Sequence, residues 1–236
     1  MRSILSFIVD RLRIRLGVPS QKWSLDNLKK NGFNPKKIVD IGAYEGKWTE
    51  EVSLIFPEAH FLMIEAQSQK ESSLKKIVEK DSKQRDYKIS LLSSTDDKKL
   101  VFNQYETASS VLVEHHNTGA EQKTITSKSL DSVLINSSFQ DLDFIKLDTQ
   151  GYEIEILKGG VLALASAKIV LMEVSFIDIY KNGPLILDVL NFMDKHHFQA
   201  YDICSIMRRP LDKALFQSDL LFVKKDSFLI QNKKWS

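Results

Sequence analysis

An acidic residue and two glycines lie at the end of a short apolar segment, where they can form a ligand site. Asp40 stands within the apolar run 38–41, and Gly42 and Gly46 follow it. Glycine lets the backbone approach a ligand closely, and the first turn of a helix presents unpaired N–H groups. A strand over 38–41, a glycine turn and a helix over 46–56 therefore predict a binding site.

The spacing of the glycines argues against a dinucleotide ligand. Dinucleotide sites carry G-x-G-x-x-G, whereas Gly42 and Gly46 are spaced G-x-x-x-G. The carboxylate of Asp40 would repel a phosphate chain and attract an ammonium group. Glu65 lies near the end of the apolar segment 60–66, 23 residues after Gly42, where a carboxylate can accept hydrogen bonds from both ribose hydroxyls. These features predict a nucleoside that carries an amino acid, and S-adenosylmethionine is the common ligand of this kind.

Several segments resemble the FkbM-type methyltransferases. They are 38–43, 64–66, 91–94 and 144–160. The most specific part is Lys-x-Asp-x-x-Gly-x-Glu, starting at Lys146, followed by Leu-Lys-Gly. The resemblance runs from about Trp23 to Lys225 and implies an S-adenosylmethionine-dependent O-methyltransferase of the Rossmann-like class. Tyr44 departs from the family, which usually has Asn or another small polar residue there.

The chain alternates between apolar strands and helical segments, which favours a doubly wound α/β sheet. The predicted strands are 38–41, 60–66, 87–92, 100–102, 124–126, 143–148, 168–174, 200–203 and 219–223. The predicted helices are 4–16, 23–30, 46–56, 67–80, 130–134, 153–164 and 185–196. The last two strands lack a strong helix between them, so we expect an antiparallel pair. This order matches the seven-stranded class I methyltransferase sheet that the resemblance implies.

We divide the chain into an N-terminal helical extension (1–34), a methyltransferase domain (35–225) and a C-terminal tail (226–236). The helix over 4–16 has one apolar face and several arginines, so it can meet an anionic membrane surface, its own domain or a partner subunit. Its apolar face carries Ile4, Leu5, Ile8, Leu12 and Leu16. The sequence contains no run of 18 apolar residues, so we predict no transmembrane helix.

The composition is that of one globular domain. The 236 residues are 43 % hydrophobic and 27 % charged, and the net charge of +2 gives no reason to expect a nucleic-acid partner. Cys204 is the single cysteine, which excludes an intrachain disulfide and a cysteine-based zinc site. We predict a cytoplasmic protein, leaving open peripheral contact of residues 1–16 with the inner face of the membrane and an oligomeric state.

The candidate site residues follow from the strand ends and from the family resemblance. The predicted cofactor contacts are Asp40, Gly42, Ala43, Tyr44, Gly46, Thr49, Glu65, Ala66, Ser93, Ser94 and Asp148. The predicted substrate contacts are Lys146 and Glu153, and the predicted general bases are Asp148, Glu173, His115 and His116. Asp148 and Glu173 have oxygen ligands that suit a divalent metal, but nothing in their spacing requires one, so none is expected.

The least regular segment, 103–128, is polar, and we interpret it as a loop on the substrate side. Its polarity favours a sugar hydroxyl or another polar small molecule as methyl acceptor, and the resemblance covers macrolide-like and carbohydrate acceptors. The predicted context is polysaccharide or natural-product biosynthesis. The alternatives are an NAD-dependent oxidoreductase, which the glycine spacing and Asp40 disfavour, and a catalytically silent Rossmann-like binding protein.

Overall fold

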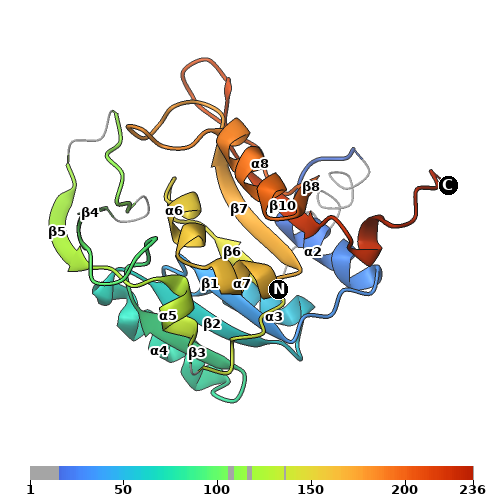
Figure 1. Cartoon of the computed structure of the whole chain (residues 1–236), viewed down its shortest axis with the longest axis horizontal. Coiled ribbons are helices and arrows are strands. Elements are labelled where there is room, and N and C mark those ends of the chain that lie inside the picture. The colour runs from blue at the N-terminus through green and yellow to red at the C-terminus, as the bar shows by residue number, and fades with distance from the viewer. Residues whose placement is uncertain (1–15, 106–108, 116–118, 136, 236) are drawn as a thin grey trace, which may run out of the picture.

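The structure is a computed structural model that describes residues 16–105, 109–115, 119–135 and 137–235 (Figure 1). The predicted N-terminal helix over 4–16 lies, apart from Leu16, outside the described residues. Among the helices of the described part, none has the length and apolar character needed to cross a membrane.

The core of the fold is one twisted sheet, ordered β3-β2-β1-β6-β7-β10-β8, with the short β9 paired to β10. Its strands are β1 (Lys37–Ile41), β2 (His60–Glu65), β3 (Arg85–Ile89), β6 (Phe144–Leu147), β7 (Ile169–Ser175), β8 (Phe198–Ile203), β9 (Met207–Arg208) and β10 (Leu215–Lys224). The first five strands of this order are parallel, whereas β10 runs antiparallel to β7 and to β8. The predicted seven-stranded, mostly parallel sheet and the antiparallel final pair are confirmed.

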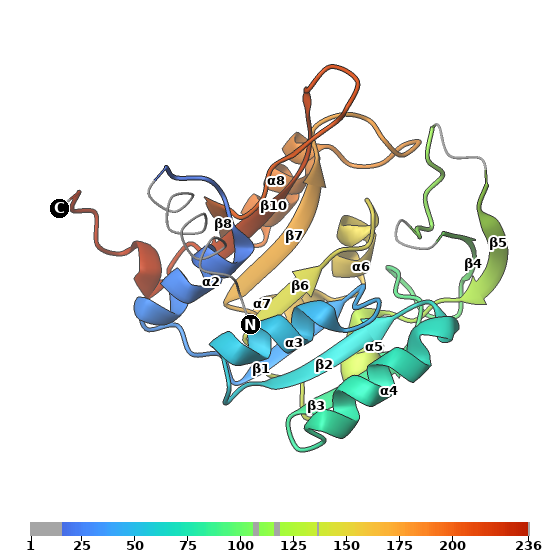
Figure 2. The ribbon, with the colours of Figure 1, turned by 180° about the vertical axis from the view of Figure 1, so that it is seen from behind.

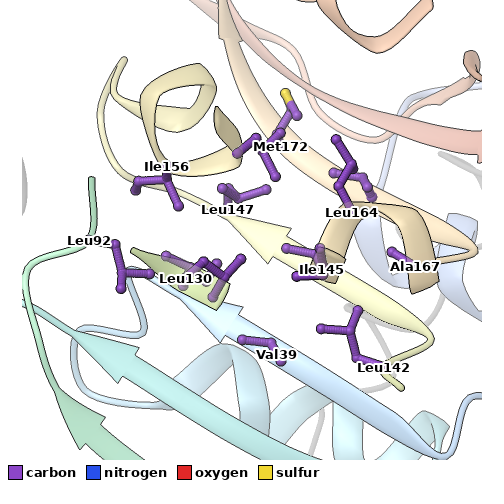
Figure 3. Close-up of a cluster of buried hydrophobic side chains, with 14 of the residues drawn as sticks. Val39, Leu92, Leu130, Leu142, Ile145, Leu147, Ile156, Leu164, Ala167 and Met172 are labelled. Carbon is purple, nitrogen blue, oxygen red and sulfur yellow. The ribbon is translucent and has the colours of Figure 1, made fainter. Parts of the chain in front are cut away.

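Side chains that alternate along each strand form cores on both faces of the sheet. On one face Val39 and Ile145 pack with α5 (Leu130–Leu134), α6 (Glu153–Lys158), α7 (Val161–Ser166) and α8 (Ile186–Lys195) (Figures 1 and 3). On the other face, seen in Figure 2, Ile38 and Phe144 pack with α2 (Gln21–Lys30) and α3 (Lys47–Ile55), while α4 (Glu71–Lys80) covers Met63. The parallel strands β1, β2, β6 and β7 are therefore buried on both sides, whereas the edge strand β3 is only partly buried.

Helix α2 belongs to this second core. Ser20 caps its start, because the Ser20 hydroxyl accepts a hydrogen bond from the Trp23 N–H. Leu25 and Leu28 are almost fully buried, and the ring of Phe33 meets Phe144 of β6 edge-on at 6.3 Å. The 3₁₀ turn η2 (Phe228–Ile230) packs Leu229 and Ile230 against the same cluster.

The helix predicted over 153–164 was wrong in one respect, because the structure breaks it into α6 and α7 at Gly159 and Gly160. A Cβ atom at Gly159 would lie 2.2 Å from the Ser93 carbonyl oxygen, and one at Gly160 would lie 2.8 Å from the Leu130 side chain. The carboxylate of Asp131 accepts hydrogen bonds from Leu162 and Ala163 N–H and so caps the second helix. The break lets α5 dock against the joint.

Segment 103–128 is more regular than predicted. β4 (Lys99–Gln104) and β5 (Glu121–Thr126) pair antiparallel over six residues each and form a separate two-stranded sheet. Their side chains are mostly polar because little packs on them, which hides the alternation expected of a strand. The strand predicted over 87–92 also ends earlier, at Ile89, and Leu92 instead forms an isolated bridge with Lys128.

The packing of α2 gives a test of stability. Leu28→Ala should lower the free energy of unfolding by about 2–5 kcal/mol, since a fully buried leucine leaves a cavity. Leu54→Ala, at a leucine that is 83 % exposed on α3, should change it by less than about 0.5 kcal/mol. Urea unfolding followed by circular dichroism measures both, and equal effects would show that α2 contributes little to the core.

Candidate active site

A cavity of about 200 Å³ opens at the carboxyl edge of the sheet, beside the ends of β1, β2 and β6. Ligands of open α/β sheets bind at this edge because strand ends and loops converge there. The lining residues are Ile41, Gly42, Tyr44, Ile64, Glu65, Ala66, Gln67, Ser90, Leu91, Leu92, Phe102, Ser109, Ser110, Val111, Asp148, Thr149, Gln150, Tyr152 and Ile156. The cavity therefore joins the glycine turn, the end of β2, the β4–β5 region and the turn after β6.

The glycine turn forms one wall of the cavity. Gly42 has a φ of 72°, and a Cβ atom there would lie 1.9 Å from the carbonyl oxygen of Asp148. Only glycine allows this contact between the ends of β1 and β6. Gly46 also has positive φ, and a Cβ on it would lie 2.9 Å from the Met63 sulfur, so Gly46 serves packing rather than the cavity wall.

Glu65 is held at the cavity wall by backbone donors. Its carboxylate accepts hydrogen bonds from the N–H of Tyr44 at 2.7 Å and of Gln67 at 2.9 Å. Burial raises the pKa of Glu65 above its ordinary value, while these two N–H groups oppose the shift. Tyr44 presents its N–H from a left-handed conformation with φ 51°, and the Lys70 ammonium lies 3.7 Å from the centre of its ring. The turn and the end of β2 are thus one unit.

Asp40 and Lys146 form a buried ion pair below the cavity. The register of β1 and β6 places them opposite each other, with Lys146 Nζ 3.0 Å from Asp40 Oδ1. Thr49 Oγ1 donates to Asp40 Oδ2 at 2.8 Å. Burial alone would lower the pKa of Lys146, but the carboxylates of Asp40 and Asp148 outweigh it and raise the pKa above its ordinary value.

This pairing changes the expected roles of three residues. Asp40, Thr49 and Lys146 do not line the cavity, although each was predicted to contact cofactor or substrate. The charge of Asp40 is already balanced by Lys146, so it is not available to attract an ammonium group. Lys146 also donates to the Gly42 carbonyl oxygen at 3.2 Å, which ties the ion pair to the glycine turn.

Asp148 is the carboxylate that faces the cavity from the end of β6. Its Oδ1 accepts a hydrogen bond from Gln150 Nε2 at 3.0 Å. The Tyr180 hydroxyl donates to Gln150 Oε1 at 2.6 Å, and this contact orients the Gln150 amide with its NH₂ toward Asp148. Ser110 Oγ donates to the Gln150 carbonyl oxygen at 2.9 Å, so residues from three separate segments position Asp148.

Glu153 braces the turn after β6 from the start of α6. Its Oε1 accepts from Thr149 N–H at 2.8 Å, from Thr149 Oγ1 at 3.1 Å and from Gly151 N–H at 3.3 Å. The side chain is buried, which raises its pKa, and it does not line the cavity. Glu153, which was predicted to contact the substrate, therefore lies behind the cavity wall and supports it.

Glu173 lies on β7, beside the Asp148 carboxylate at the end of β6. In the strand register it stands opposite Asp219 of β10. Burial, reinforced by the charges of Asp148, Glu153 and Asp219, raises its pKa to about 9. Gln217 Nε2 donates to Glu173 Oε1 at 2.6 Å. A pKa of about 9 favours the protonated form of Glu173 at neutral pH, so Glu173, which also does not line the cavity, is poorly suited to the predicted role of general base.

Of the remaining predicted residues that the structure describes, Ala66 lines the cavity, whereas Ala43, Ser93, Ser94 and His115 do not. Ser93 is buried and shares a hydrogen bond of 3.1 Å with the Tyr152 hydroxyl, and neither it nor Ser94 lines the cavity, whereas Ser90 to Leu92 do. Ala43 packs against Met63 behind the turn. His115 Nε2 lies 3.2 Å from Asp178 on the surface, outside the lining, and His116 lies outside the described residues.

Several lining residues were not predicted. Phe102 lies at the end of the predicted strand 100–102, and Ser109, Ser110 and Val111 lie in the segment that the sequence indicates only as a polar substrate-side loop. Gln150 and Tyr152 lie inside the family-like motif. Their position between Asp148 and Glu153 could have identified them as site residues. The described residues contain no group of three or more His, Cys, Asp or Glu side chains arranged to hold a metal ion.

The buried ion pair should be essential for stability. Lys146→Met leaves the Asp40 carboxylate buried without its cation and should destabilise the fold by about 3–5 kcal/mol. The double variant Asp40→Leu/Lys146→Met should recover much of this loss, because no charge is then stranded. Lys36→Met removes an exposed pair with Glu58 and should lose less than about 1 kcal/mol. Urea unfolding measures all three, and additive losses in the double variant would contradict a coupled pair.

Glu173 should make stability depend on pH. Its folded pKa of about 9 lies above the ordinary carboxyl value, so the folded protein holds a proton that the unfolded chain has released. Stability should therefore fall as pH rises from neutrality through about 9. Glu173→Gln keeps a neutral side chain and should flatten this fall, whereas Glu51→Gln, on the exposed side of α3, should not. Thermal unfolding measured across this pH range tests the prediction. Parallel pH profiles for the wild type and Glu173→Gln would contradict the assignment.

The described fold is similar to solved methyltransferase structures. One is an S-adenosylmethionine-dependent methyltransferase from Clostridium acetobutylicum ATCC 824, with 11 % identity, a TM-score of 0.51, and coverage of 93 % of this chain and 97 % of that chain. Another is magnesium protoporphyrin IX methyltransferase from Synechocystis PCC 6803 with bound S-adenosylmethionine, with 9 % identity, a TM-score of 0.51, and coverage of 89 % and 81 %. At these identities the likeness shows a shared class I methyltransferase fold.

A third structure, TrmK of M. capricolum in complex with S-adenosyl-homocysteine, has 11 % identity and a TM-score of 0.50 and covers 85 % of this chain and 67 % of that chain. No curated protein sequence matches the chain significantly. A family model for the methyltransferase FkbM domain matches residues 40–200, from the buried Asp40 of β1 to Ala200 in β8. The match spans well over half of the sequence and includes the three strand ends beside the cavity. The chain belongs to the FkbM methyltransferase family.

Proposed function

We propose that the protein is an S-adenosylmethionine-dependent methyltransferase that methylates a hydroxyl group. The observation that supports this most directly is the charge of the cavity wall. Among the described residues that line it, Glu65 and Asp148 are acidic and none is Lys or Arg. A dinucleotide would place its pyrophosphate against this wall without a side-chain cation, whereas a sulfonium with an ammonium group is attracted by it.

The chemistry of the lining also fits the rest of the cofactor. Glu65 is fixed by two N–H groups and offers carboxylate oxygens to ribose hydroxyls. Leu91, Leu92 and Phe102 provide apolar surface suited to the faces of an adenine ring. Asp148 stands at the end of β6, where it suits the cationic part of the molecule.

The cofactor, when bound, supplies an activated methyl group on sulfur. The protein then has to hold the acceptor oxygen in line, and alignment of this kind is worth about 7–11 kcal/mol at best. We propose that Asp148 accepts the hydrogen bond of the acceptor hydroxyl and takes its proton, a contribution of roughly 10²–10⁴-fold. Gln150 and Tyr180 keep the carboxylate in one orientation for this step.

The acceptor that we propose is a sugar or another polar small molecule. Ser109, Ser110 and Gln150 place polar groups on the cavity wall opposite the glycine turn. Such groups can exchange hydrogen bonds with hydroxyls. Ser109 Oγ, Ser110 Oγ and the Gln150 amide are already hydrogen-bonded within the protein, so an acceptor hydroxyl would add to these contacts through their remaining lone pairs.

Calorimetric titration tests the proposal. The full chain should bind S-adenosylmethionine and S-adenosylhomocysteine and show no heat with NAD. Glu65→Gln should weaken S-adenosylmethionine about tenfold to a hundredfold, because charged hydrogen bonds to the ribose are lost. Glu58→Gln, an exposed glutamate paired with Lys36, serves as the matched control and should bind like the wild type. Binding of NAD without S-adenosylmethionine would overturn the proposal.

A further inference from the structure

We infer that the protein docks on anionic lipid through a surface at the carboxyl edge of the sheet. This docking surface has two parts: the loop between β8 and β10, residues 204–214, and the segment 16–23 that leads into α2. Both views of the ribbon show the β8–β10 loop projecting beyond the sheet (Figures 1 and 2). Because β8 is parallel to β7, its end lies on the same edge as the cavity.

The β8–β10 loop exposes large apolar side chains. Leu211 is 85 % exposed, and Met207 and Ile206 are about half exposed. Arg208 and Lys213 lie between and beside them and have no carboxylate partner among the described residues, whereas Arg209 is neutralised by Asp212. Apolar tips flanked by cations are typical of surfaces that enter the boundary between lipid head groups and acyl chains.

The second part is joined rigidly to the same strands. Gln21 Nε2 donates to Asp219 of β10 at 2.7 Å, and Ser24 Oγ donates to Asp202 of β8 at 2.6 Å. Val18 and Trp23 line an open apolar recess together with Ile203 at the end of β8. Leu16, 68 % exposed, is the first described residue. The start of α2 therefore extends the apolar surface across the edge strand.

The chain that precedes Leu16 has the composition expected of a lipid-binding segment. Residues 1–15 contain Arg2, Arg11, Arg13 and Arg15 against a single acidic residue, Asp10, and more than half of them are apolar. This sequence is covalently joined to Leu16, the first described residue of the docking surface. Anionic lipid head groups complement its positive charge. A second copy of the chain would bring like charges together, which disfavours a dimer through this surface.

Sedimentation with vesicles tests the inference on the full chain. The protein should sediment with vesicles of equal parts phosphatidylglycerol and phosphatidylcholine and remain in the supernatant with phosphatidylcholine alone. High salt should weaken the binding, since screening reduces attraction between exposed charges. Equal binding to both kinds of vesicle, or to neither, would overturn the inference.

Paired substitutions locate the surface. Met207→Asp/Leu211→Asp should reduce partition to the anionic vesicles at least about tenfold, because burial of both side chains in lipid is lost. Leu54→Asp/Leu162→Asp changes leucines that are 83 % and 72 % exposed on α3 and α7, outside the docking surface, and should have less than about a twofold effect. Equal loss in both pairs would overturn the assignment to the β8–β10 loop.

Two further measurements separate docking from other causes. Thermal unfolding and S-adenosylmethionine titration should be unchanged in Met207→Asp/Leu211→Asp, which shows that a loss of vesicle binding does not arise from misfolding. Light scattering should give the same mass for wild type and variant. A wild-type dimer that this variant dissociates would instead identify the surface as a protein interface and overturn the lipid assignment.

Discussion

The ion pair between Asp40 and Lys146 is the interaction on which the site depends. Each charge alone would be unfavourable in the core, and the register of β1 with β6 brings them together at 3.0 Å. Lys146 also holds the Gly42 carbonyl and lies 3.8 Å from Asp148. The pair thus couples the glycine turn to the carboxylate at the cavity wall from a position that no ligand in the cavity touches.

Much of the fold could be predicted because its strands are short, apolar and separated by helices. The position of Glu65 after Gly42 was informative since parallel strands end at one edge, so residues at successive strand ends become neighbours. The structure places Gly42, Tyr44, Glu65, Ala66 and Asp148 together on the cavity wall, as the strand ends and the family resemblance suggested.

The remaining features of the fold and site depend on contacts between distant residues, which no local sequence pattern indicates. The partner of Asp40 follows from the register between β1 and β6, residues more than a hundred positions apart. Segment 103–128 looked irregular because β4 and β5 bury little, yet Asn103 holds the loop that follows β4 by donating to the Ser110, Val111 and Leu112 carbonyls. The break between α6 and α7 is likewise visible only once Leu130 and Ser93 are packed against Gly159 and Gly160.

The contact between Gly42 and the Asp148 carbonyl restricts how this enzyme can diversify. Two backbones in van der Waals contact leave no side chain whose exchange would widen the cavity at that point, so the junction of β1 and β6 is fixed by main-chain geometry. Another part of the lining carries the side chains of Ser109 and Ser110, which belong to the separate β4–β5 hairpin. Directed evolution toward new methyl acceptors should therefore select mutations in that hairpin, because the junction of β1 and β6 tolerates few substitutions.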